Sequence, residues 1–505
     1  MKNIIARKFI TIVLAAAVSS GSMAVAQEFK VTPGSLGVTV SVPADASTIV
    51  LDGRVNGADL HYIATHCRGL RMLDLSKVSV VSYSSNRRLT ANVTAHVADE
   101  LPPFQLSGLK AGQVRLPEGI TAIGAGALMG AEITSVVIPA SVKSIGDGAF
   151  AACRNLTEVT VPATVGSVGS DAFNGCTSLA RVTYMADDVP SGCFAGCVSL
   201  REVSLPQSGG SIGARAFSGC VALEDMEMPD ALRTIGEEAF AASGIVRADM
   251  SGCRSLASVG DRAFAKCLSL ESVEFPSGAT VSMGEGLFFD DSSLMSVRFP
   301  DVMSHIPDMT LKGATGLSDI YSSLPEGVEA IGRLAYHGMG SVAEASLPST
   351  LSYIGDRAFE GWTSLQMLDA TQLREVPALG ENVWAGVDQA SVLLSVTPEM
   401  EDSYLAADQW KEFSIRRSGT TGIELNGTGA RVSVMFDGMT LRIRGSEEIL
   451  SAVLHDMSGY MLASETPQPA VCDLDMDTSG FSTQFFILTV RLVSGDTATL
   501  KLLRK

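Results

Sequence analysis

The residues best suited to catalysis or metal binding in this chain are its six histidines and nine cysteines. The histidines are scattered, at His61, His66, His96, His305, His337 and His455. None belongs to an H-E-x-x-H motif, and no close pairing of histidines indicates a metal site. Cys193 and Cys197 form a C-x-x-x-C pair, but no second cysteine pair and no nearby histidine accompanies it. We therefore predict no metal site and no catalytic residue.

Motifs for nucleotides and nucleotide-like cofactors are also missing from the sequence. The G-x-x-x-x-G-K-[ST] pattern does not occur, and no Rossmann glycine pattern stands between a strand and a helix. We therefore predict no cofactor. Catalytic triads that form only in three dimensions are not visible in a sequence, so a secreted hydrolase with an unrecognised site stays open as an alternative.

The charge balance narrows the choice of partners. The chain has 505 residues and a formal net charge of −18. Binding to nucleic acid requires clustered lysine and arginine, and an acidic surface is repelled by anionic lipid. The composition therefore argues against both and favours a neutral or basic partner.

A sequence repeat runs through most of the chain. A bulky residue, here called the register residue, returns every 21 to 25 positions inside the phrase I-G-x-x-A-F-x-x-C-x-x-L-x-x-V-x-x-P. A near-fixed period of this length is typical of a stacked solenoid. The register residues are Phe104, Leu128, Phe150, Phe173, Phe194, Phe217, Phe240, Phe264, Phe288, Leu311, Tyr336, Phe359 and Trp384.

One coil of this repeat is predicted from its residue types. Leu156, Val159 and Val161 are spaced to face the interior, and Pro162 ends the short strand because it cannot donate to the next ladder. After the turn glycine Gly146 we expect a tight helical segment, with Phe150 filling the core. The predicted fold class is an α/β-type repeat solenoid of short parallel strands and tight helical turns.

The cysteines follow the same repeat. Five of them fall three residues after a register residue: Cys153, Cys176, Cys197, Cys220 and Cys267. This spacing favours one small buried core position, because free cysteine packs as a hydrophobe. Neighbouring coils also lie within disulfide reach, so a bridge between Cys153 and Cys176 or between Cys197 and Cys220 stays open.

The outward residues of the predicted strands form the candidate binding surface. All strands of a solenoid lie side by side in one sheet, so their outward side chains form one continuous stripe. The stripe is mostly acidic and contains three arginines. The candidate ligand-binding residues are Glu158, Arg181, Glu202, Asp225, Glu227, Arg247, Asp249, Glu274, Arg298 and Tyr321.

The two ends of the chain have a different composition. Basic residues, the apolar stretch from Phe9 to Val18 and the ending Ala24-Val25-Ala26 predict a signal peptide over residues 1–26. No segment is long and apolar enough for a transmembrane helix. The expected organisation is an N-terminal cap and first repeat (27–76), the solenoid (77–390), a C-terminal cap (391–417), a linker (418–427) and a small all-β sandwich (428–505), which is a candidate sorting domain.

The coils resemble the BspA-like leucine-rich repeat family of bacterial surface proteins. Residues 51–60 and 70–76 resemble the family's N-terminal cap, and Val396-Thr397-Pro398, Tyr404 and residues 410–413 resemble its closing segment. The resemblance implies display at the cell surface or release outside the cell, with adhesion to proteins or glycans of a host or of other bacteria. Solenoids of one fold bind unrelated ligands, so it does not name this ligand.

The C-terminal residues resemble the sorting domains of type IX secretion. The resemblance rests on residues 455–460, H-D-M-S-G-Y, and on residues 500–505, L-K-L-L-R-K, whereas the usual G-x-Y is replaced by Gly480-Phe481. It implies contact with the secretion machinery through the tail. We therefore expect an exported binding protein that is not an enzyme and that uses its strand face, with a secreted hydrolase or a structural envelope protein as alternatives.

Overall fold

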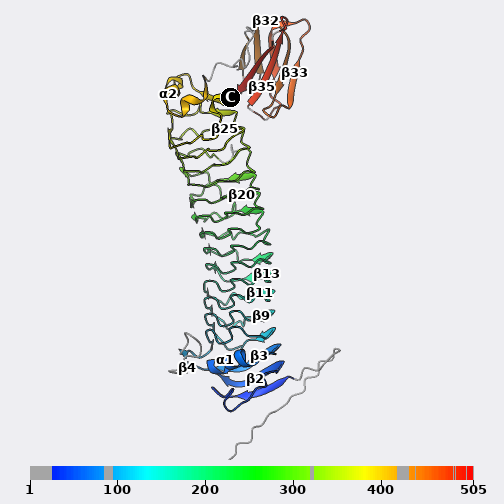
Figure 1. The fold of residues 1–505 in the computed structure, drawn as a ribbon, viewed down its shortest axis with the longest axis vertical. Coiled ribbons are helices and arrows are strands. Elements are labelled where there is room, and N and C mark those ends of the chain that lie inside the picture. The colour runs from blue at the N-terminus through cyan, green and yellow to red at the C-terminus, as the bar shows by residue number, and fades with distance from the viewer. Residues whose placement is uncertain are drawn as a thin grey trace, which may run out of the picture.

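The computed structural model describes residues 26–84, 95–318, 324–417, 432–437, 440–481, 483, 485–495 and 497–503. Residues 1–25 of the predicted signal peptide, the linker 418–427, Tyr321 and the last two residues lie outside the described part. Figure 1 shows a long rod of stacked coils, with a small β domain at its C-terminal end. The predicted fold class, a repeat solenoid followed by a small all-β domain, is confirmed.

Parallel strands line one side of the rod. They form an eight-stranded sheet and then two shorter sheets, and every pairing between them is parallel. In order along the rod they are β1 (Gln27–Val31), β2 (Thr48–Val55), β3 (Met72–Val80), β7 (Gln113–Arg115), β9 (Ser135–Val137), β11 (Glu158–Val161), β13 (Arg181–Tyr184), β15 (Glu202–Ser204), β18 (Arg247–Asp249), β20 (Ser272–Glu274), β22 (Ser296–Arg298), β25 (Glu344–Ser346), β27 (Met367–Asp369), β29 (Leu393–Val396) and β30 (Ser414–Arg417). We call the outer surface of these strands the strand face.

Two-residue strands form a second set of parallel ladders, which ends at the turn of each coil. They are β6 (Glu100–Leu101), β8 (Ala122–Ile123), β10 (Ser144–Ile145), β12 (Ser167–Val168), β14 (Asp188–Val189), β16 (Ser211–Ile212), β17 (Thr234–Ile235), β19 (Ser258–Val259), β21 (Ser282–Met283), β23 (His305–Ile306), β24 (Ala330–Ile331), β26 (Tyr353–Ile354) and β28 (Ala378–Leu379). This set is divided into three sheets, with breaks between β12 and β14 and between β21 and β23.

In the described residues, helices occur only near the two ends of the solenoid, where the caps are predicted. Helix α1 (Gly57–His66) begins at Asn56, whose side chain accepts hydrogen bonds from the N–H groups of Ala58 and Asp59. The short hairpin of β4 (Tyr83–Ser84) and β5 (Ala95–His96) follows the cap. The C-terminal cap contains η2 (Gln389–Ser391), α2 (Glu401–Ala406) and η3 (Trp410–Glu412). One hydrophobic core runs from Phe29 to Phe413.

The predicted helical segments are turns, not helices. In the coil of Phe150, the N–H groups of Gly148, Phe150 and Ala152 donate to the next coil, to the carbonyls of Ser170, Ala172 and Asn174. Residues two before and two after the register residue have positive φ, as at Gly148 (56°) and Ala152 (57°). Because of this alternation, every second N–H group points along the rod toward the next coil. In an α-helix these N–H groups would instead bond to the carbonyl four residues earlier in the same segment.

The register aromatics fill the core, as predicted. The rings of Phe150, Phe173, Phe194, Phe217 and Phe240 are fully buried and stack on one another with centroids 5.1–5.5 Å apart. The first assignment is wrong, however. Leu106, not Phe104, holds the register position, because its N–H donates to Ala127 as that of Leu128 donates to Ala149.

The repeated cysteines occupy a buried core position. Cys153, Cys176, Cys197, Cys220 and Cys267 are all free thiols, and the described residues contain no disulfide. Each Sγ lies 3.1–3.3 Å from a backbone carbonyl of the preceding coils; Cys176, for example, donates to Phe150. Burial raises the pKa of Cys197 to about 12, which keeps this thiol protonated.

The C-terminal β domain is antiparallel throughout. Its strands are β31 (Val432–Asp437), β32 (Thr440–His455), β33 (Met461–Glu465), β34 (Val471–Asp477), β35 (Phe485–Leu492) and β36 (Thr497–Leu503). The long strand β32 pairs with β31 and β34 through its first half and with β33 and β35 through its second half. Its own hydrophobic core includes Leu441, Phe486 and Leu500.

Candidate functional site

The strand face presents two outward residues per coil, on either side of an inward one. Because neighbouring strands are in register, Glu158 lies beside Arg181, and Arg181 lies beside Glu202. The same register aligns Arg247, Ser272 and Ser296 further along the rod. We call these positions the first outward row, and the positions two residues later the second outward row. Parallel pairing thus turns residues about 23 positions apart into close neighbours.

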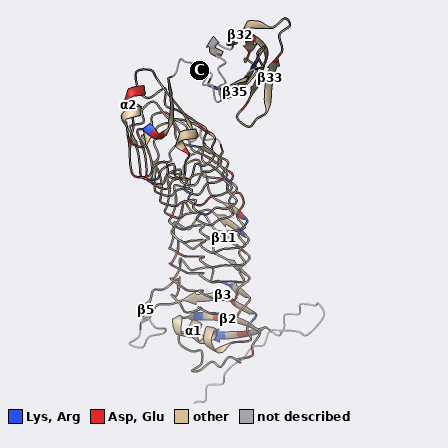
Figure 2. Cartoon of the chain, turned by 45° about the horizontal axis from the view of Figure 1, so that its top comes forward, with Lys and Arg blue, Asp and Glu red and all other residues tan. Residues whose placement is uncertain are grey.

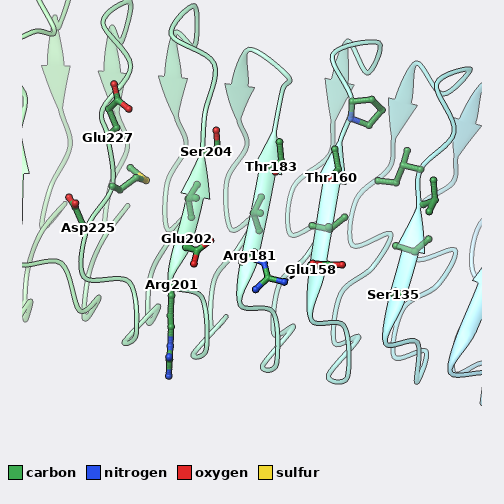
Figure 3. Close-up of a pocket in the computed structure, with 18 residues that line it drawn as sticks. Ser135, Glu158, Thr160, Arg181, Thr183, Arg201, Glu202, Ser204, Asp225 and Glu227 are labelled. Atoms are coloured by element: carbon green, nitrogen blue, oxygen red, sulfur yellow. Dashed lines mark hydrogen bonds and ion pairs between the residues drawn. The ribbon is translucent and has the colours of Figure 1, made fainter.

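A groove of about 700 Å³ follows the strand face across five coils, and we call it the N-terminal groove. Its floor and walls come from residues between Ser135 and Glu227, including Glu158, Arg181 and Glu202. Figure 3 shows these side chains on adjacent strands, with Arg181 directed toward Glu158. A space of this size is comparable to known ligand pockets.

Fixed charges alternate along the N-terminal groove. The guanidinium of Arg181 donates to Glu158 at 2.8 Å, and both side chains are more than half exposed. The hydrogen bond to Glu158, and then the nearby charges of Glu158 and Glu202, raise the pKa of Arg181. Exposed ion pairs of this kind contribute little to stability, about 0–1 kcal/mol. Their groups therefore remain available to a ligand at small energetic cost.

The acidic end of this groove is formed by Asp225 and Glu227. Glu227 accepts a hydrogen bond of 3.1 Å from Gln207, and within the described residues Asp225 and Glu202 form no ion pair. The stretch around Asp225 has no strand assignment, so the prediction of a strand there is wrong. The two carboxylates nevertheless line the same groove as Glu202.

A second groove of about 530 Å³ lies further along the strand face, and we call it the C-terminal groove. Arg247, Asp249, Glu274 and Arg298 line it, and Arg298 donates to Glu274 at 3.1 Å. The hydroxyl and N–H of Ser251 donate to Asp249, which lowers the pKa of that carboxyl. Asp249 is therefore held ionised and oriented at neutral pH.

Nine of the ten predicted ligand-binding residues line these two grooves. The N-terminal groove brings together Glu158, Arg181, Glu202, Asp225 and Glu227, and the C-terminal groove brings together Arg247, Asp249, Glu274 and Arg298. The tenth, Tyr321, lies outside the described residues. The prediction missed Arg201 and Val137, which also line the N-terminal groove. Arg201 precedes its strand, and Val137 is an apolar residue at an outward position of β9, where its side chain is 80% exposed.

The grooves offer ion pairing and hydrogen bonding, and no group of three or more potential metal ligands occurs among the described residues. The stretch Gly209–Gly213 has the G-x-S-x-G spacing of a nucleophile elbow, which the prediction of no catalytic residue did not take into account. Its Ser211 lies in β16, is followed by a turn instead of a helix, and donates to Asp188 at 2.8 Å. The strand-to-helix context of an elbow is therefore missing at Ser211.

The H-D-M-S-G-Y stretch of the tail forms a hairpin turn between β32 and β33. Asp456 accepts hydrogen bonds from the hydroxyl and N–H of Ser458 and from the N–H of Tyr460, which lowers its pKa. Asp456 of this motif therefore has a structural role, because its carboxylate closes the hairpin turn. No helix of the described residues is long and apolar enough to cross a membrane.

Comparison with known proteins identifies the repeats. The model of the BspA type leucine-rich repeat region, with six copies, matches residues 103–189, 187–318 and 319–392, more than half of the chain. A leucine-rich repeat protein from Bacteroides ovatus is 24% identical, with a TM-score of 0.56 over 70% of this chain and 85% of that chain. This similarity shows a shared fold.

Two further solved structures are less similar. A leucine-rich cell surface protein from Faecalibacterium prausnitzii is 22% identical, with a TM-score of 0.33 over 57% of this chain and 94% of that chain. The pneumococcal vaccine antigen PcpA is 15% identical, with a TM-score of 0.31 over 64% of this chain and 83% of that chain. No curated protein matches the chain.

Proposed function

Because the chain belongs to the BspA-type leucine-rich repeat family, we propose that it is an exported adhesion protein that binds a surface protein or glycan through its strand face. The observation that carries this proposal is the pair of grooves on one rigid face, both lined by fixed charges of both signs. Complementary charge gives specificity and speeds association, so such a face suits recognition of a charged macromolecule.

The charge of the grooves indicates the class of ligand. The N-terminal groove contains the acids Glu158, Glu202, Asp225 and Glu227 against the bases Arg181 and Arg201. The C-terminal groove adds Asp249, Glu271 and Glu274 against Arg247 and Arg298. Both grooves have an excess of carboxylates, so we propose a ligand that is neutral or basic where it contacts them.

Charge reversal in the groove tests this role. The purified protein is used in pull-downs against extracellular matrix and mucin fractions, untreated or treated with protease or periodate to separate protein ligands from glycans. Asp225→Lys combined with Glu227→Lys should weaken capture at least tenfold, because it turns an attractive end of the groove into a repulsive one.

A matched control changes the same net charge elsewhere. Glu237 and Glu285 are exposed acids of the turn segments and line neither groove. Glu237→Lys combined with Glu285→Lys should leave capture unchanged. Equal loss with both pairs would show that only net charge matters, and unchanged capture with the groove pair would move the site away from the N-terminal groove.

We also propose that residues 1–26 direct export and that the tail engages a secretion machinery. Strand β1 begins at Gln27, next to the proposed cleavage point. Mass spectrometry of the protein from culture medium and from the cell surface should find Gln27 as the first residue. A mature protein that retains residues 1–26 would contradict the proposal. The same measurement reports whether the residues after 431 are kept or removed.

The two alternatives, a secreted hydrolase and a structural envelope protein, have less support. Ser211 is the one serine described above with a catalytic spacing, and it lies outside both grooves. A screen with fluorescent activity probes would detect a reactive residue. Self-association in light scattering would favour the structural role.

A further inference from the structure

The strand face changes character at its C-terminal end. Register pairing aligns Glu344 of β25 with Met367 of β27 and with Leu393 of β29, so all three belong to the first outward row. At this position earlier coils carry exposed charged or polar residues, such as Glu158, Arg181 and Glu202. Two successive coils here carry large apolar side chains instead. An apolar pair on an outward row marks a contact surface.

This pair is covered by the chain's own C-terminal domain. Met367 is 1% exposed and Leu393 is 6% exposed, and both form a hydrophobic cluster with Phe485 of β35, which is 2% exposed. Met457, in the turn between β32 and β33, packs against the same cluster. Figure 1 shows the β domain at the end of the rod, beside the last coils. The cluster is separate from the core of the solenoid and from the core of the β domain.

Phe485 belongs to the contact cluster and not to the core cluster of the β domain. Its neighbour Phe486 points the opposite way in the strand and belongs to the core of the β domain. Because side chains alternate across a strand, Phe485 would lie on the surface of an isolated β domain. Burying a phenylalanine contributes about 1.5–3 kcal/mol relative to leaving it exposed. The contact is therefore favourable but small.

We propose that Met367 and Leu393 form a further binding site on the strand face, separate from the two grooves, and that its occupant is the chain's own C-terminal domain, held there through Phe485. A contact of a few side chains is far below the roughly 1,200 Å² of a stable interface between separate proteins. A covalent connection changes this, because residues 418–431 hold the two partners at a high effective concentration. This is why the occupant is the chain's own domain and not that of a second copy.

The site selects for an aromatic side chain presented by a β-strand. It also differs from the two grooves, because Met367 and Leu393 are apolar at positions of the first outward row where the grooves carry charged residues. When the C-terminal domain is displaced, an apolar patch becomes exposed at the end of the strand face. The proposal does not depend on the ligand of the grooves.

The test uses the full chain and the fluorescence of a dye that binds exposed apolar surface. Phe485→Asp places a charge in the cluster, releases the domain and should raise dye fluorescence several-fold over wild type. Adding Met367→Ser and Leu393→Ser to Phe485→Asp removes the exposed patch and should return the signal to the wild-type level. Met461→Asp, at a 56% exposed position of β33, is the control for a new charge in the same domain and should change nothing.

Each outcome decides the proposal. No increase with Phe485→Asp overturns it, because the patch would then not be covered by this domain in solution. An increase that persists in the triple variant also overturns it, because the dye would then report unfolding of the β domain. Small-angle scattering of Met367→Asp checks the docking from the solenoid side, where a larger radius of gyration with unchanged circular dichroism is expected. If wild-type scattering is dimeric and the variant is monomeric, the occupant is a second copy and the proposal fails.

Discussion

The position three residues after each register residue shows what the cysteines contribute. Cys176, Cys197 and Cys220 donate to carbonyls buried in the core, where an unpaired carbonyl would cost about 1–3 kcal/mol. Trp362 stands at the equivalent position and donates from Nε1 to the Tyr336 carbonyl at 2.8 Å. In these coils a hydrogen-bond donor occupies this place in the core, and a thiol is one of the groups that provide it, whereas other coils carry an apolar residue there, such as Ala131, Ala314 or Met339.

Asp291 occupies the same position but is an acid. It is fully buried, its Oδ1 accepts the N–H of Cys267 at 2.7 Å, and its Oδ2 has no partner among the described residues. Burial, with a smaller contribution from the charge of Asp290, raises the pKa of Asp291 to about 9. The carboxyl is therefore protonated at neutral pH, and in this form it has a proton to donate, as cysteine has.

Asp291 makes stability depend on pH. In the unfolded chain its pKa is about 4, so between about pH 4 and pH 9 the folded state binds the proton and the unfolded state releases it. Its contribution is thus fully present below about pH 4 and is lost as pH rises toward 9. Asp291→Asn keeps a donor without the ionisation, so it should stabilise the protein by on the order of 3 kcal/mol at neutral pH.

Urea unfolding of wild type and Asp291→Asn at about pH 5 and pH 8 measures this effect. The gap between the two midpoints should widen at the higher pH. An equal gap at both values would mean that the carboxyl is ionised in the folded protein. Asp290→Asn is the neighbouring control and should produce a much smaller change.

At the scale of the elements, prolines divide the second set of ladders. Its two breaks lie between β12 and β14 and between β21 and β23, and Pro190 and Pro307 follow directly after β14 and β23. In most coils the turn glycine donates its N–H to the preceding coil, as Gly213 does to Val189. Proline has no N–H to donate, so the ladder is interrupted where it replaces glycine.

The turn glycines are required by close stacking of the coils. A Cβ atom on Gly236 would lie 2.4 Å from the backbone nitrogen of Ala214 in the preceding coil. Gly236→Ala should therefore destabilise the protein by about 1–3 kcal/mol, measured as a lower urea midpoint. Gly119→Ala is the matched control, because nothing lies within 4 Å of a Cβ there, and its midpoint should change little. Equal midpoints for the two variants would contradict the close stacking.

The repeat could be predicted from the sequence because the core residues of each coil recur in the same order. Phe150 and Cys153 recur at constant spacing, and a buried position tolerates few residue types. The conformation of the turns was predicted wrongly, because Asp147-Gly148-Ala149-Phe150 suits a helix when taken alone. Its N–H groups instead bond to the next coil, which a reading of one coil does not include. Phe104 was assigned to the register position because it is aromatic. The alternation along this coil places Leu106 there instead.

At the scale of the whole molecule, the sequence indicated which face of the solenoid holds the candidate site. It did not indicate that this face contains grooves. Outward positions follow from alternation along each strand, so residues such as Glu202 and Arg247 could be chosen from the sequence. The depth of a groove depends on the curvature of the stacked coils and on the direction of the side chains, and neither can be read from the spacing of residues in the sequence. The contact of Phe485 with Met367 and Leu393 could not be predicted either, because Phe485 lies 92 residues after Leu393 and 118 residues after Met367, in a domain without the repeat.

The direction of the ladders determines how this molecule responds to mechanical load. Hydrogen bonds between coils run along the rod, from Gly148 to Ser170 and onward, so tension between its ends acts on them one coil at a time. Each coil that peels away would release about 23 residues of chain, or roughly 80 Å of extension. If the chain acts as the proposed adhesion protein, a sudden pull would lengthen the rod coil by coil before the attachment breaks. Acidic and basic residues are interspersed along the whole rod, as Figure 2 shows. When some coils unfold, the coils that remain stacked therefore still present charged residues on the strand face.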